Sequence, residues 1–160
     1  MMKNKRGQLF AEPFMWILAL LVAALVLAFG FVAISKLQET FAQTTVIDFK
    51  NDFERSVNEV YYLDAGSSKI LKVDLPDRIR RACFYTGHGN INRQLVSQIE
   101  ASVIEQSKNK NMFLLPYDAY KFEWSYKIKD IKTSSFICFD NKKELKLVAQ
   151  GNYVEIARPS

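Results

Sequence analysis

The chain has 160 residues, of which 49% are hydrophobic and 24% are charged, and its formal net charge is +5. This composition excludes a disordered chain, a collagen-like repeat and a disulfide-dense toxin. Three of the basic residues lie before residue 7, so the remaining sequence is nearly balanced in charge, and we expect no nucleic acid as a partner.

The first predicted element is an apolar run from Pro13 to Ile34, which holds 22 residues without a charged, amide or hydroxyl side chain. At about 1.5 Å rise per residue, a helix of this length is about 33 Å long, enough to cross about 30 Å of hydrocarbon. A secretory signal peptide has a shorter apolar core, of about 7–15 residues, followed by a small-x-small cleavage site. We therefore expect a transmembrane helix over residues 8–35, with the lipid bilayer as its partner.

Positive residues that flank a first membrane helix tend to remain in the cytoplasm. Lys3, Lys5 and Arg6 form such a cluster in the basic leader, residues 1–7. They predict a single-pass protein of the cell membrane with a cytoplasmic N-terminus and an extracytoplasmic domain, and a surface filament is the alternative location.

The leader also has a recognisable pattern, because residues 3–12 read KNKRGQLFAE and the apolar run follows directly. This resembles the leader of type IV pilin-like proteins, and more closely the archaeal class III signal peptide. The resemblance implies that a prepilin peptidase cuts between Gly7 and Gln8 on the cytoplasmic side. Glu12 then becomes the fifth residue of the mature chain, where the family carries its glutamate.

A carboxylate at the edge of a hydrocarbon span is costly unless it has a partner or reaches water. If cleavage frees the amine of Gln8, that cation on a neighbouring subunit can neutralise Glu12 and set the stagger between subunits. The alternative is that Glu12 is an interfacial residue at the helix N-terminus, wetted by headgroups. The match to the family is partial, since Phe10 and Trp16 stand where it favours a small polar residue and a leucine.

The helix is expected to continue past the membrane, from about residue 10 to residue 63, with a weak interruption near Thr44 and Thr45. Over residues 36–63 the apolar positions recur mostly every three or four residues, which predicts an amphipathic extension packed on a domain. A glycine-containing turn at 64–68, with Gly66 as the C-terminal cap, should end it. The expected apolar face consists of Leu37, Phe41, Val46, Phe49, Phe53, Val57, Val60 and Tyr61.

Residues 64–160 are expected to form an extracytoplasmic head. Alternating and short apolar runs predict five to seven strands of one antiparallel sheet with a polar face, and residues 91–106 predict one further helix. The fold class is α+β, a long N-terminal helix packed on a small antiparallel β-sheet head, and pilin- or pseudopilin-like in outline. The aromatic stripe in 120–128 predicts sheet core, with a surface for a sugar or a partner strand as the alternative. The expected strands are 69–75, 81–86, 112–115, 120–128, 136–139, 145–148 and 153–156, the last two forming a hairpin.

Cys83 and Cys138 are the only cysteines, and each lies in a strand-like apolar stretch. In an oxidising compartment they are candidates for a disulfide, which would stabilise the domain by roughly 4 kcal/mol through a loop of about 55 residues. The alternative is two buried thiols that act as small hydrophobic side chains.

No pattern of catalytic residues is present, so we expect no enzyme, no cofactor and no metal site. The single histidine, His88, lies in a Gly-His-Gly turn, and the short basic cluster Arg78, Arg80 and Arg81 is typical of a solvated turn or a contact with an acidic partner. The expected function is a type IV pilin-like subunit, minor or accessory, of an archaeal surface filament or secretion-type assembly, with itself or other pilin-like subunits as partners. The alternative is an uncleaved single-pass anchor for an extracytoplasmic binding or scaffold domain.

Overall fold

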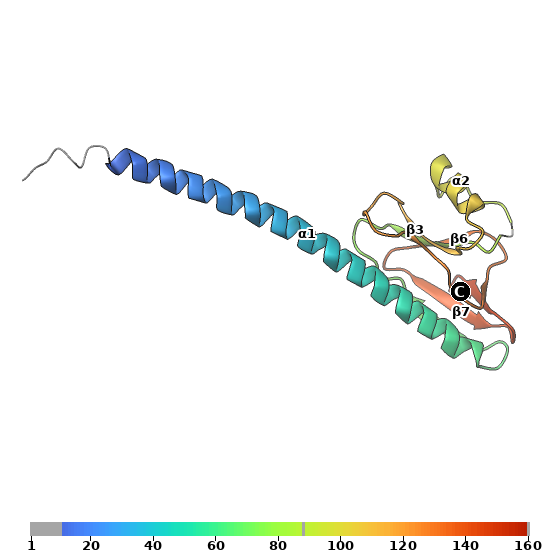
Figure 1. The fold of residues 1–160 in the computed structure, drawn as a ribbon. Helices are drawn as coiled ribbons and strands as arrows, with labels where there is room; N and C mark the ends of the chain where they lie inside the picture. Colours follow the sequence, from blue (N-terminus) through green and yellow to red (C-terminus); the bar gives the residue numbers. More distant parts are fainter. Residues whose placement is uncertain (1–10, 88, 160) are drawn as a thin grey trace, which may run out of the picture. The chain divides into compact units, whose positions relative to one another are not determined.

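A computed structural model describes residues 11–87 and 89–159 of the chain. The chain divides into two compact units, Met1–Phe41 and Ala42–Ser160, and each is described by itself. Helix α1 contributes to both units, and the other elements belong to the second unit, the head (Figure 1). The elements are α1 (Ala11–Tyr61), β1 (Ser68–Lys72), β2 (Arg81–Phe84), α2 (Gln98–Gln106), β3 (Met112–Leu115), β4 (Ser125–Tyr126), β5 (Ile131–Lys132), β6 (Ile137–Asp140), β7 (Glu144–Ala149) and β8 (Val154–Ala157).

Helix α1 runs without a break, so the predicted long helix is confirmed and the expected interruption at Thr44 and Thr45 is wrong. One helical turn of β-branched residues lowers helix stability only slightly when the neighbouring turns are packed. After the helix, Gly66 adopts the left-handed conformation (φ +91°) that favours glycine, and its N–H donates to Ala149 O at 2.8 Å. The predicted turn is therefore tied to strand β7.

The predicted buried face of α1 is confirmed from Val46 onward and wrong at its start. Leu37 and Phe41 are 55% and 63% exposed, and the buried stripe begins instead at Ala42. The periodic pattern is the same on both sides of this boundary, so it could not indicate how far along the helix the head extends. The buried stripe consists of Ala42, Val46, Phe49, Phe53, Val57 and Val60.

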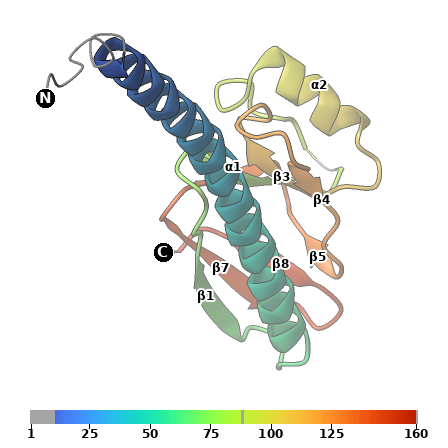
Figure 2. The same ribbon diagram turned by 60° about the vertical axis from the view of Figure 1, so that its left-hand side comes forward.

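The head contains two four-stranded sheets where one was expected. Sheet A has the order β1-β7-β8-β5, and sheet B has the order β4-β3-β2-β6. All pairs are antiparallel except β5 and β8, which are parallel, so the wholly antiparallel prediction is also wrong. The predicted β7–β8 hairpin is confirmed, with Ala149 opposite Val154 next to the turn. Figure 2 shows α1 passing along sheet A.

Sheet B is covered on both faces, so the expected polar face is absent from it. Along β2 and β3, alternate residues enter two different cores. The main core combines the stripe of α1 with the inner face of sheet A and with Phe84 of β2, whose ring lies 5.0 Å from the ring of Phe53. The second core places Cys83 and Phe113 of the opposite face against Ile104 of α2.

The predicted helix over 91–106 is wrong in its first half, because α2 begins only at Gln98. Before it, Asn92 Oδ1 accepts a hydrogen bond from the N–H of Gln94 at 2.9 Å, which forms a local turn. Ser97 then caps the helix: its Oγ accepts from the N–H of Glu100, and the Glu100 carboxylate accepts from the N–H of Ser97. This capping box fixes the start of the helix.

The expected strand over 120–128 is also wrong, since only β4 pairs there, with Met112 and Phe113 of β3. Before β4 the Tyr120 and Phe122 rings stack at 5.1 Å, and both pack against the main core. The aromatic stripe therefore contributes to the core as predicted, with Tyr126 in the β3–β4 ladder and with Tyr120 and Phe122 held by ring packing. The expected strand over 69–75 is shorter, and the two-residue β5 was not predicted.

Candidate functional site

The first unit contains the apolar segment, residues 13–34, within α1. Its large side chains are exposed on all sides of the helix, as Trp16 (72%) and Phe31 (75%) illustrate. The helix has a mean hydropathy of 3.0 in its most apolar window, and by length and composition it can cross a membrane. None of that window is buried by the described residues, so the segment is not the covered core helix of this domain.

Three residues predicted to act in processing and assembly lie at the N-terminal end of this segment. Glu12 belongs to the first described turn of α1, immediately before Pro13. Gly7 and Gln8 lie outside the described residues, as does His88. The cleavage and the Glu12 pairing therefore stay predictions.

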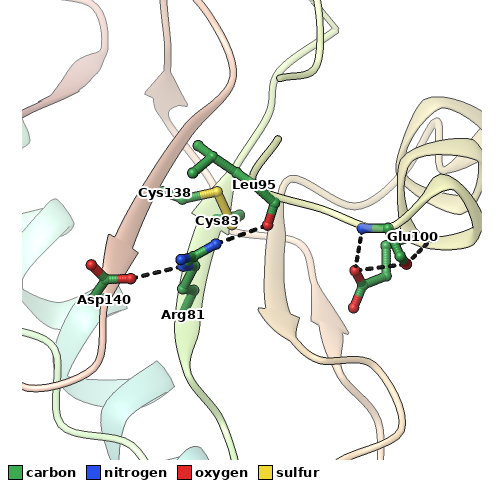
Figure 3. The surroundings of a disulfide bond; sticks show 7 residues. Arg81, Cys83, Leu95, Glu100, Cys138 and Asp140 are labelled. Atoms are coloured by element: carbon green, nitrogen blue, oxygen red, sulfur yellow. Dashed lines mark hydrogen bonds and ion pairs between the residues drawn. A yellow bond between two sulfur atoms is a disulfide. The ribbon is translucent and has the colours of Figure 1, made fainter. Parts of the chain in front are cut away.

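In the head, Cys83 of β2 and Cys138 of β6 are joined by a disulfide, with an S–S distance of 2.01 Å. The two residues are direct cross-strand partners in sheet B, and both are buried in the second core. The bond therefore links segments 55 residues apart in the sequence, at the strand pair that separates the two cores (Figure 3).

Arg81 lies two residues before Cys83 and connects three segments of the head. Its Nε donates to Asp140 Oδ1 at 2.7 Å, and one of its terminal nitrogens donates to the carbonyl of Leu95 at 2.9 Å (Figure 3). Arg81 is thus a structural residue that fixes the 91–97 segment beside the disulfide. From the sequence, Arg81 was grouped with Arg78 and Arg80 as a solvated turn or a contact with an acidic partner, and Asp140 could not be named because it is distant in the sequence.

Buried Glu100 is a second residue whose role the sequence missed. One carboxylate oxygen accepts from Ser97 N and Ser97 Oγ, both at 2.8 Å, and the other accepts from Tyr117 N at 3.2 Å. These bonds compensate the burial of the carboxylate and connect α2 to the segment after β3. Only the Ser-x-x-Glu spacing of the capping box could have indicated it from the sequence.

Two groups of the head have shifted pKa values. The Lys69 ammonium donates a hydrogen bond to Glu59, and this bond together with its positive charge holds the pKa of Glu59 below its usual value of 4.5. Burial raises the pKa of Tyr126 above 10.0, and the negative charge of Glu123 adds to the effect. Glu59 lies in an exposed chain of ion pairs with Lys69 and Arg55, and Tyr126 is half-buried in the head.

Among residues 11–87 and 89–159, no group of three or more His, Cys, Asp or Glu side chains is arranged to hold a metal ion. No family model, no curated protein and no solved structure matches this chain. The functional argument therefore depends on the chemistry of the apolar segment and of the head.

Proposed function

We propose that this protein is a type IV pilin-like subunit, minor or accessory, of an archaeal surface filament or secretion-type assembly. In this proposal residues 8–35 insert into the cell membrane, and the head lies outside the cytoplasm. A prepilin peptidase removes residues 1–7, and the role is non-enzymatic, since the subunit acts by assembling with its neighbours.

One observation carries the proposal: a single unbroken helix holds both the exposed apolar segment and the buried stripe of the head. A soluble monomer rarely exposes an apolar surface of more than a few hundred Å². Residues 13–34 therefore need a non-aqueous environment, which lipid provides before assembly and neighbouring helices provide afterwards. The apolar segment and the stripe in the main core are parts of one continuous helix.

The leader supports the processing step. The basic-Gly-Gln junction lies five residues before Glu12, which is the spacing that the resemblance to class III signal peptides requires. In the proposed assembly the freed amine of Gln8 neutralises Glu12 of a neighbouring subunit. This pairing would offset the cost of a carboxylate beside hydrocarbon and would fix the axial register.

The first test is the intact mass of the chain co-expressed with an archaeal prepilin peptidase. The proposal expects a mature chain that starts at Gln8, and it expects Gly7→Trp to remain uncleaved because the bulky ring blocks the junction. A chain that keeps residues 1–7 in the presence of an active peptidase contradicts the processing step, and it favours the uncleaved single-pass anchor.

The second test is filament assembly, measured by electron microscopy of sheared surface fractions. Glu12→Ala should abolish incorporation of the subunit while leaving membrane insertion and head folding intact. The matched control is Asp48→Ala, which removes an exposed carboxylate from the same helix. If Glu12→Ala assembles as well as the control, the residue is only an interfacial group and the assembly proposal fails.

A further inference from the structure

The head has a groove of about 530 Å³ that no sequence pattern indicated. It lies between the end of β2, the turn that follows α2 and the segment from β4 to β5. Figure 2 shows α2, β4 and β5 on one side of the head. Two of these segments contribute four lysines to it, against one carboxylate, Glu105, and these lysines are Lys108, Lys110, Lys127 and Lys132.

Three of the four lysines have no carboxylate partner among the described residues of the head. Lys110 forms an ion pair with Glu123, and the Lys132 ammonium lies 4.6 Å from the centre of the Tyr153 ring. Among the residues that the structure describes, no carboxylate lies within 4.0 Å of the ammonium groups of Lys108, Lys127 or Lys132. These three groups are therefore available to an anion.

The helix dipole does not account for the cluster. Lys108 and Lys110 follow the C-terminal end of α2, where positive side chains are stabilised by the helix carbonyls. Lys127 and Lys132 come from the other side of the groove, near β4 and β5, and not from the turn that follows α2. Their convergence on the same groove leaves a field that favours a negatively charged ligand.

The groove suits an extended ligand more than a single ion. A second hollow of about 290 Å³ shares Thr86 and Lys132 with the first, so the two hollows meet at Lys132. Tyr85 lines the first hollow and Tyr153 lines the second. The Tyr85 ring also packs edge-on against Phe136, and the Lys132 ammonium lies over the Tyr153 ring, so both rings are half-buried walls of the hollows.

The backbone at the groove leaves little for a peptide to pair with. The N–H of Tyr85 already donates to Asn111 O at 3.0 Å, and the N–H of Asn111 donates to Tyr126 O at 2.9 Å. Strand β5, which forms the edge of sheet A here, is only two residues long. Recognition by strand addition needs a longer free edge, so side-chain contacts must dominate.

We propose that this groove binds an acidic sugar chain, whose carboxylates pair with the ammonium groups of Lys108, Lys127 and Lys132. Its hydroxyl-rich rings would lie against the tyrosine rings and the polar side chains of the groove. This site concerns the head alone, and it does not depend on cleavage of the leader or on filament assembly.

Isothermal titration of the full chain, held in uncharged detergent micelles at low salt, tests the proposal with oligogalacturonate as the probe. Neutralising the groove with Lys108→Gln, Lys127→Gln and Lys132→Gln should weaken binding by at least about tenfold, since three charge pairs are lost. The matched control removes the same charge from exposed lysines outside both hollows, with Lys72→Gln, Lys121→Gln and Lys143→Gln, and should keep affinity within about twofold.

Two further probes separate the sources of binding. A neutral cello-oligosaccharide of the same length should bind much more weakly, because it lacks the carboxylates. Oligoglutamate of equal charge should also bind more weakly, because it lacks the rings and hydroxyl groups. The proposal is overturned if oligogalacturonate does not bind, if the control triple variant loses as much affinity, or if either comparison probe binds as tightly. In the last case, tight oligoglutamate binding would assign the groove to an acidic peptide.

Discussion

The two parts of helix α1 differ both in how their apolar side chains are distributed and in what surrounds them. In residues 13–34 every helical face carries apolar side chains, and the large ones are exposed. In residues 42–60 the apolar side chains occupy one stripe, and the described core of the head covers it. The helix is continuous through both parts, so backbone propensity does not distinguish them.

The difference indicates that the distribution of apolar side chains, and not the backbone, suits one part of the helix to an apolar environment and the other part to packing on a domain. A helix that is apolar all round is stable only where no water surrounds it, whereas a helix with one apolar stripe needs a single packed partner. Changes in the first part should therefore affect membrane insertion and leave the head stable. Changes in the second part should destabilise the head and leave membrane insertion unaffected.

The largest effect is expected from charges within the apolar segment. The double variant Leu21→Arg and Leu25→Arg places two cations on one face near the middle of the segment, at a cost of about 5 to 7 kcal/mol for insertion. The fraction that resists alkaline extraction of membranes should fall sharply. The control, Gln43→Arg with Ile47→Arg, has the same spacing on exposed positions of the head unit and should remain in the membrane. Equal extraction of both variants would contradict the expected difference between residues 13–34 and the head part of α1.

A large effect on the head is expected from Phe53→Ala. Phe53 is fully buried, with its ring 5.0 Å from Phe84 and 6.1 Å from Phe49, so the cavity should lower the free energy of unfolding by about 3 to 5 kcal/mol. Urea unfolding in micelles, followed by Trp124 fluorescence in a Trp16→Phe background, measures this free energy of unfolding. Phe31→Ala in the apolar segment should leave that free energy unchanged. A similar loss in both variants would mean that the two parts of α1 are not distinct.

Removal of the disulfide should have a slightly smaller effect. The Cys83→Ala and Cys138→Ala double variant frees a loop that spans 55 residues, and it should lower the free energy of unfolding of the head by about 2 to 4 kcal/mol. Reductant should destabilise the original chain and leave the double variant unaffected, while membrane extraction should not change in either. Two free thiols in the unfolded, unreduced chain would show that the cysteines are not paired.

The smallest effect concerns Glu59 at the end of α1. Because its folded pKa is lowered by Lys69, the pair contributes stability above the usual carboxyl pKa of 4.5, and that contribution is lost as the pH falls through the folded pKa. A carboxyl titration by NMR should place the Glu59 midpoint below 4.5, and Lys69→Gln should raise it. An unchanged Glu59 midpoint in Lys69→Gln would show that Lys69 does not lower the pKa of Glu59.

The sequence predicted α1 and several strands because their signals are local. The apolar run and the three- or four-residue spacing from Val46 onward specify a helix whatever surrounds it. The short runs that became β3 and β7 combine buried apolar side chains with turn residues at their ends. Such features do not depend on distant contacts.

The sequence failed where distant contacts decide the structure. The 91–97 segment reads as helix, but the Asn92 turn and the bond from Arg81 to the Leu95 carbonyl hold it in another conformation. The alternation over 120–128 reads as a strand, but ring packing fixes Tyr120 and Phe122 without a ladder. The disulfide was left open, because only the folded register places Cys83 opposite Cys138. The lysine groove depends on three separate segments and could not be predicted.

The central claim, that one helix lies in lipid over residues 13–34 and in the head after residue 42, can be measured directly. Spin labels at single cysteines along α1, in the chain reconstituted in bilayers, report accessibility to oxygen in lipid and to a water-soluble nickel reagent. The account predicts high oxygen accessibility across residues 13–34, highest near Ala23 and Ala24, and then a three- to four-residue alternation of nickel accessibility from Ala42 to Val60. Nickel accessibility at Leu21 and Leu25 as high as at Gln43 would contradict it.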